Sequence, residues 1–135
     1  MKTHETPVVL MADDDEDDCL LAKDAFEMSG GLGAFICVED GQKLMDYLLR
    51  SDPLPALILL DLNMPRKDGR EVLKEIKAIP AFQRIAIVIL TTSSEEDDVT
   101  FSRKMGAKSF ITKPAAFSEW IKMMKSLAEN WLVEP

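Results

Sequence analysis

The chain has 135 residues, of which 47% are apolar and 30% are charged, and its formal net charge at pH 7 is −8. This size and composition are typical of one folded domain with a single core and leave no room for a second domain. The negative charge argues against binding to nucleic acid or to an anionic membrane, because both would repel the protein surface.

Short apolar runs alternate with longer amphipathic segments along the chain. The runs lack the alternation of a strand with one solvated face, so they predict strands buried on both faces. They cover residues 8–12, 34–38, 56–60, 85–90 and 109–112. Helical periodicity lies between them and is clearest from Phe117 to Trp131. The order βαβαβαβαβα predicts an α/β fold, in which helices cover both faces of one parallel sheet.

Polar side chains follow four of these predicted strands. They are Asp13 and Asp14 after the first, Asp61 after the third, Thr91 and Thr92 after the fourth, and Lys113 after the fifth. Ligands of such sheets bind at the carboxyl ends of the strands, so these groups are expected to converge. Two carboxylates about 4 Å apart repel by roughly 4 kcal/mol at an effective dielectric near 20. A divalent cation relieves that repulsion, and clustered carboxylate oxygens suit Mg²⁺.

The carboxylates at positions 15–18 have a separate explanation, because they fall at the start of the next predicted helix. There they favour the helix dipole and the unpaired N–H groups of the first turn. Cys19 and Cys37 are interpreted as buried free thiols in a reducing compartment. The sequence shows no signal peptide and no apolar run long enough to span a membrane, so a cytoplasmic location is expected.

Four motifs in this order, "LMADD", "LLDLNMPRKDG", "VILTTS" and "FITKP", resemble the CheY-like receiver domain of two-component response regulators. The resemblance runs over nearly the whole chain. The phrases "DLNMPRKDGREVLKEIK" and "VILTTSSEEDD" are most similar to small stand-alone receivers that serve bacterial phytochrome-type histidine kinases. The family resemblance implies a flavodoxin-like (βα)5 fold, a doubly wound parallel sheet with strand order 2-1-3-4-5.

The resemblance also implies a metal site. Asp61 is similar to the phosphoacceptor of the family, and Asp13 and Asp14 are similar to the acidic pair that holds Mg²⁺ directly or through water. Asn63 matches the residue whose backbone carbonyl completes the metal shell. A haloacid-dehalogenase-type phosphatase would need a second Asp at position 63 as general acid, so Asn63 argues against that alternative.

Three further residues take their implied roles from the same motifs. Thr91 matches the hydroxyl that bonds the phosphoryl group, and Lys113 matches the amine that pairs with it. Phe110 stands where the family often has a switch Tyr, so the switch is expected to rely on packing alone. The Lys113–Pro114 peptide bond is expected to be cis.

Residues 1–135 are therefore expected to form a single receiver domain, with residues 1–7 as a flexible N-terminal tail and no output domain. His4, the only histidine, lies in that tail, so the phosphoryl group is expected to come from another molecule. The family resemblance implies that this donor is a phosphohistidine of a sensor histidine kinase. The signal is expected to leave by protein contact, to a downstream target, along a phosphorelay or between two copies of the chain. The alternative is a receiver-like module that binds a partner without phosphorylation.

Overall fold

The computed structural model describes residues 6–132, which contain a five-stranded parallel sheet in the order β2-β1-β3-β4-β5. The strands are β1 (Val8–Ala12), β2 (Ala34–Val38), β3 (Leu57–Leu60), β4 (Ala86–Thr91) and β5 (Ser109–Thr112). The helices are α1 (Glu16–Met28), α2 (Gly41–Arg50), α3 (Gly69–Ala78), α4 (Glu96–Lys104) and α5 (Phe117–Trp131), with a short 3₁₀ helix at Pro80–Phe82. The predicted fold class and strand order are confirmed.

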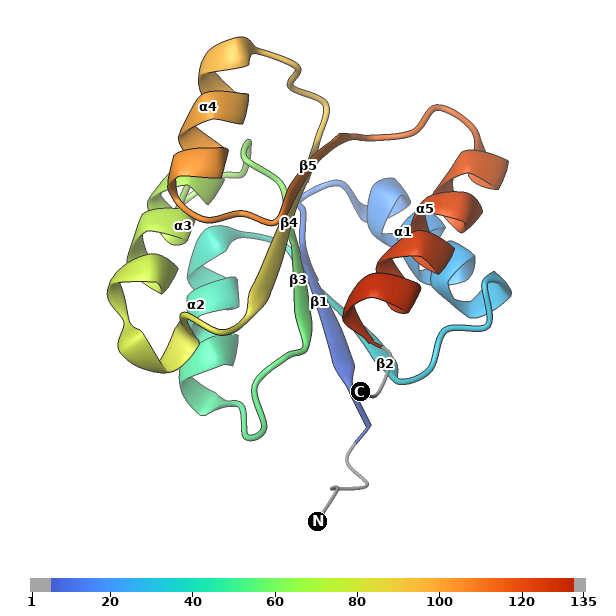
Figure 1. Cartoon of the computed structure of the whole chain (residues 1–135), viewed down its shortest axis with the longest axis horizontal. Coiled ribbons are helices and arrows are strands. Elements are labelled where there is room, and N and C mark those ends of the chain that lie inside the picture. The colour runs from blue at the N-terminus through green and yellow to red at the C-terminus, as the bar shows by residue number, and fades with distance from the viewer. Residues whose placement is uncertain (1–5, 133–135) are drawn as a thin grey trace.

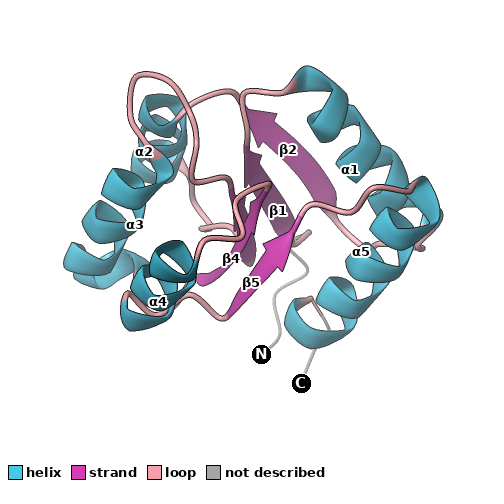
Figure 2. Cartoon of the chain, turned by 90° about the horizontal axis from the view of Figure 1, so that it is seen from above, coloured by secondary structure: helices cyan, strands magenta, loops and turns pink. Residues whose placement is uncertain are grey.

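Helices cover both faces of the sheet, with α1 and α5 on one side and α2, α3 and α4 on the other (Figure 1, Figure 2). Successive strand residues point to opposite faces, so each strand supplies both layers of the core. Leu10 and Ile58 pack in the layer under α2 and α3, whereas Met11 and Leu59 pack in the layer under α1 and α5.

Burial differs between the central and the outer strands. All residues of β3 and β4 are buried, as predicted. The prediction of burial on both faces is wrong for β2 and β5, whose residues are half-buried or exposed. These two strands form the edges of the sheet, and each has a neighbouring strand on one side only.

The N-terminal part of the predicted tail is not described. His4 and the rest of residues 1–5 lie outside the described residues. The carbonyl of Pro7 accepts a hydrogen bond of 2.9 Å from the N–H of Ala34. The chain is therefore already bonded to β2 at the residue before β1. None of the described helices has the length and apolar character needed to cross a membrane.

Candidate functional site

The sheet hydrogen bonds continue one residue past three strands and fix the polar residues that follow. The N–H of Asp13 donates to the carbonyl of Val38 at 3.0 Å, and the N–H of Asp61 donates to that of Ala12 at 3.1 Å. On the other side of the sheet, the N–H of Lys113 donates to the carbonyl of Thr91 at 2.8 Å. The predicted convergence at the carboxyl edge therefore follows from the strand register.

Three carboxylates meet at this edge. Asp13, Asp14 and Asp61 each offer an oxygen, and these oxygens all lie within 4.8 Å of one another. Asp13 and Asp61 are buried, whereas Asp14 is exposed. Buried like charges at such separations repel strongly unless a cation compensates them.

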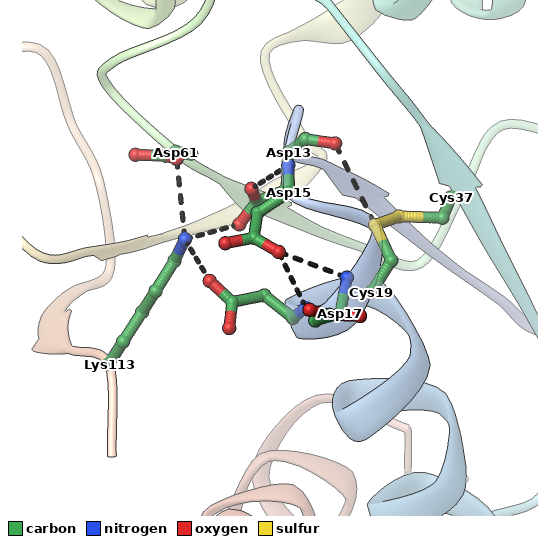
Figure 3. The surroundings of a disulfide bond; sticks show 8 residues. Asp13, Asp15, Asp17, Cys19, Cys37, Asp61 and Lys113 are labelled. Carbon is green, nitrogen blue, oxygen red and sulfur yellow. Dashed lines mark hydrogen bonds and ion pairs between the residues drawn. A yellow bond between two sulfur atoms is a disulfide. The ribbon is translucent and has the colours of Figure 1, made fainter. Parts of the chain in front are cut away.

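Among the described residues, Lys113 provides the positive charge that lies between these carboxylates. Its Nζ lies 2.7 Å from a carboxylate oxygen of Asp13, 2.7 Å from one of Asp18 and 3.4 Å from Asp61 Oδ2 (Figure 3). Burial opposes the charged form of the lysine, but the surrounding carboxylates outweigh burial and raise its pKa above the usual range. The side chain is 8% exposed, so this ammonium is held inside the site.

Asp13 remains short of compensation despite this ion pair. Burial raises the pKa of its carboxyl from 3.8 to about 6, although Lys113 and the N–H of Asp15 both oppose that rise. Its Oδ2, which lies 2.7 Å from the Lys113 Nζ, is buried and has no further partner among the described residues. A buried acceptor with spare capacity, beside two further carboxylates, fits the ligand set of a hard divalent cation.

Besides Lys113, which approaches Oδ2, two donors bond the Oδ1 of Asp61. The Thr91 hydroxyl donates to Oδ1 at 2.8 Å, and the backbone N–H of Asn63 donates to the same oxygen at 3.2 Å. Thr91 is fully buried. The structure therefore brings Thr91 and Lys113 to Asp61, as expected from the sequence, and it places the Asn63 peptide beside that carboxylate.

Gly69, at the end of the loop after Asp61, packs so closely against the backbone that it leaves no space for a side chain. A Cβ at Gly69 would lie 2.2 Å from the backbone oxygen of Asp61, so no larger residue fits without moving the backbone of Asp61. The residue with a positive φ in this loop is Arg66, at 63°. Close approach to the backbone of Asp61, rather than a positive φ, is therefore the reason for a glycine at position 69.

A second charged cluster joins this loop to the start of α4. Arg70 donates from Nε and Nη2 to the two carboxylate oxygens of Asp98, at 2.9 and 2.8 Å. The Ser93 hydroxyl also donates to Asp98, at 2.7 Å, and the Nη1 of Arg70 donates to Asp68. We call Asp68, Arg70, Ser93 and Asp98 the clamp. The quoted motifs contain these residues but do not predict the clamp, because its members are up to 30 residues apart and no local pattern pairs them.

Phe110 lies on β5, pairs with Ile89 of β4 and is half-buried against the core layer that contains α2 and α3. It lines a small cavity of about 160 Å³ together with residues of α4, among them Val99 and Ser102. The cavity provides space in which the Phe110 ring can repack between α4 and β5.

The carboxylates at the start of α1 largely act as expected. Asp15 is the N-cap and accepts from the N–H groups of Asp17 and Asp18. Asp18 has a second role, since its side chain also pairs with Lys113. This role was not predicted, because the two residues are 95 positions apart in the sequence. The first turn of α1 lies beside the carboxyl ends of the strands, so Asp18 can favour the helix dipole and also pair with Lys113.

Two expectations for this region are wrong. Cys19 and Cys37 are not free buried thiols but form a disulfide between α1 and β2, and Cys37 is exposed because β2 is an edge strand (Figure 3). The Lys113–Pro114 bond is trans, and the cis bond found among the described residues precedes Pro53. Lys113 reaches Asp61 without the rarer isomer.

Comparisons with known proteins agree with this geometry. Rcp1, a response regulator of Synechocystis sp., is 38% identical over 130 residues, which cover 93% of this chain and 88% of Rcp1. The crystal structure of Mn²⁺-bound Rcp1 superposes with a TM-score of 0.85, at 37% identity and 96% coverage of both chains.

The phosphorylated cyanobacterial phytochrome response regulator RcpA gives a TM-score of 0.86 at 38% identity, covering 93% of this chain and 94% of that one. These similarities confirm the expected likeness to phytochrome response regulators. Residues 9–125 match the response regulator receiver domain. The chain therefore belongs to the response regulator receiver domain family.

Proposed function

We propose that this protein accepts a phosphoryl group from a phosphohistidine of a sensor histidine kinase onto Asp61. The observation that carries the proposal is the meeting of three carboxylates within 4.8 Å, with the Lys113 ammonium 3.4 Å from Asp61. In this proposal, Asp13, Asp14, Asp61 and the backbone carbonyl of Asn63 hold a Mg²⁺ ion. The Oδ2 of Asp13 supports that assignment, because the Lys113 ammonium is its one partner among the described residues and a carboxylate oxygen can accept a further ligand.

The residues around Asp61 suit in-line phosphoryl transfer. A carboxylate oxygen of Asp61 attacks phosphorus while the bond to the donor nitrogen breaks, and negative charge spreads over the equatorial oxygens. The Lys113 ammonium neutralises part of that charge, and the Thr91 hydroxyl leaves Asp61 to donate to the phosphoryl group. The bound cation supplies the remaining positive charge. The protein thereby promotes its own phosphorylation and dephosphorylation, while its role is signalling.

The similar proteins suggest the partner. Rcp1 is named a response regulator, RcpA a phytochrome response regulator, and RtBRR and AtBRR bacteriophytochrome response regulators. We therefore propose a cytoplasmic histidine kinase of the phytochrome type as the phosphodonor. Because the donor must approach Asp61 in line, the docking surface includes α1 beside the acidic cluster.

The output surface in this proposal is formed by α4, β5 and α5. Phosphorylation draws Thr91 toward the phosphoryl group, and the half-buried Phe110 repacks beside α4. The altered surface then contacts a second copy of the chain, a downstream target or the next protein of a phosphorelay. Phe110→Ala should alter this output and largely spare phosphate uptake, whereas Lys113→Ala should uncouple uptake from the conformational response.

Incubation with acetyl phosphate tests the proposal. We expect a Mg²⁺-dependent mass increase of one phosphoryl group, located on Asp61 by peptide mapping and lost in Asp61→Asn. Asp17→Asn is the matched control, because Asp17 is an exposed carboxylate in the first turn of α1. Persistent modification of Asp61→Asn without transfer to a neighbouring carboxylate would contradict the assignment. Partner binding without any phosphorylation would favour the phosphorylation-independent module instead.

A further inference from the structure

The two cysteines of the chain form one bridge between α1 and β2. Cys19 lies in α1 and Cys37 in β2, their Cα atoms are 6.3 Å apart, and the sequence contains no other cysteine. A Cα separation of this size lies within the usual range for disulfides. The bridge therefore needs no movement of either element to form.

Solvent reaches this bridge. Cys37 is exposed on the edge strand and Cys19 is partly exposed. Both line a cavity of about 550 Å³, whose walls also include Asp13 and Asp14. Exposed disulfides exchange with external thiols much more readily than buried ones, and this behaviour is typical of regulatory rather than structural bridges.

The bridge also touches the acidic cluster. The Sγ of Cys19 lies 3.7 Å from the backbone oxygen of Asp13 (Figure 3). The N–H of Cys19 donates to the carbonyl of Asp15, the cap of α1, and the preceding residue is Asp18, which pairs with Lys113. A tether at Cys19 therefore holds the first turn of α1 and the strand end that carries Asp13 in one arrangement.

We propose that Cys19 and Cys37 form a reversible redox site whose state sets the affinity of the acidic cluster for a divalent cation. The oxidant is a low-molecular-weight disulfide such as glutathione disulfide. The Cys37 thiolate attacks one of its sulfur atoms and releases one glutathione thiolate. The Cys19 thiolate then attacks the Cys37 sulfur and releases the second, so two protein thiols lose two electrons and two protons. Excess thiol reverses both exchanges.

The direction of the effect follows from charge. Without the tether, repulsion among Asp13, Asp14 and Asp61 favours an outward movement of the β1–α1 loop, which separates the ligand oxygens. With the tether, these oxygens stay close before the cation arrives. The oxidised protein therefore binds the cation more tightly, as expected when a contact behind a ligand is fixed in advance.

The first arm of the test measures reversibility. The full-length protein is equilibrated at a series of glutathione to glutathione disulfide ratios and its free thiols are counted by maleimide labelling and mass. We expect an intramolecular disulfide that forms and breaks across the series, and a bridge that resists excess glutathione would overturn the proposal. So would disulfide-linked dimers in place of the bridge.

The second arm measures the Kd for Mn²⁺ by electron paramagnetic resonance, with no phosphodonor present. We expect the oxidised form to bind about 10-fold more tightly than the reduced form, the lower end of what supporting contacts around a metal ligand contribute. The Cys19→Ser and Cys37→Ser variants should give a single Kd, close to that of the reduced protein, under either condition.

This inference rests on the proposed metal site, and the outcomes separate the two. Equal affinity of the oxidised and reduced proteins for Mn²⁺ would overturn the redox coupling and leave the metal site intact. Absence of saturable Mn²⁺ binding in both states would overturn the metal site and the coupling together. Redox dependence that survives in Cys19→Ser would assign the effect to another cause and overturn the role of the bridge.

Discussion

Asp13 and Asp98 are both buried aspartates paired with a cation, yet their pKa values shift in opposite directions. Burial raises the pKa of Asp13 to about 6, whereas two hydrogen bonds from Arg70 hold the pKa of Asp98 below its usual range. Burial outweighs the ion pair with Lys113 at Asp13, whereas the hydrogen bonds from Arg70 outweigh burial at Asp98. The two cations also serve different numbers of carboxylates. Lys113 faces three carboxylates, while Arg70 presents a planar fork to Asp98 and one further N–H to Asp68.

The comparison separates an incomplete charge cluster from a complete one. At the acidic cluster, Asp14 adds a carboxylate for which no contact with Lys113 is found, and the buried Oδ2 of Asp13 has the shared Lys113 ammonium as its one partner among the described residues. In the clamp, both oxygens of Asp98 are bonded, by Arg70 and Ser93. The first arrangement is suited to binding a further cation, and the second joins the start of α4 to the start of α3.

Removal of the Asp13 carboxylate should have the largest effect on the free energy of unfolding and on its pH dependence. Because its pKa is raised in the folded protein, Asp13 contributes stability fully below pH 3.8 and loses that contribution as the pH rises to about 6. The shift corresponds to at most about 3 kcal/mol of the free energy of unfolding. In chelator, Asp13→Asn should show a flatter pH dependence of urea unfolding in this window.

Asp98 of the clamp does not contribute to the pH dependence of stability between pH 3.8 and about 6. Because its pKa is lowered in the folded protein, the stability that it contributes is lost only as the pH falls below 3.8. Asp24→Asn, an exposed carboxylate of α1, is the control and should keep the slope of the natural protein. An unchanged slope in Asp13→Asn would contradict the interpretation that this carboxyl is uncompensated.

Opening the clamp should have the next largest effect. Arg70→Ala leaves the buried Asp98 without its cation, and because the arginine side chain is 34% exposed we expect a loss of about 2 kcal/mol rather than the full cost of a buried pair. Adding Asp98→Asn should recover part of that loss in urea unfolding. Additive losses in the double variant would show that the two side chains do not act together.

Removal of one hydroxyl should have the smallest effect. Ser93→Ala deletes one of the hydrogen bonds to Asp98 and should lower the free energy of unfolding by about 1 kcal/mol. It should also increase amide exchange at the start of α4. Ser94→Ala, at the exposed neighbouring position, is the control and should leave both measurements unchanged. Equal effects of the two substitutions would remove Ser93 from the clamp.

Sequence patterns predicted the part of the molecule that parallel strands determine. The strand ends carry Asp61, Thr91 and Lys113 to one edge, so their meeting follows from the order of the strands and needs no side-chain detail. Each predicted strand lies within one residue of the observed bounds. Burial on both faces was wrong for the outer strands, because an apolar run does not reveal whether a strand has one neighbour or two.

The missed features depend on distances between elements rather than on periodicity. The bridge of Cys19 and Cys37 requires the helix after one strand to lie over the next, and the ion pair of Asp18 with Lys113 requires a helix start to face another strand end. No local pattern encodes these pairings. The acids after two strands were a sufficient signal for the meeting of three carboxylates, but not for the pairing of Asp18, in the first turn of α1, with Lys113.

A Mg²⁺ titration of the ¹⁵N-labelled protein, followed by the chemical shifts of its backbone amides, tests the contrast between the two clusters most directly. We expect saturable shifts at residues 13–18 and 61–63, with the amides of Arg70 and Asp98 nearly unchanged. The shifts at residues 13–18 should disappear in Asp13→Asn. The absence of saturable shifts around Asp13 and Asp61, or shifts of equal size around Asp98, would contradict this expectation.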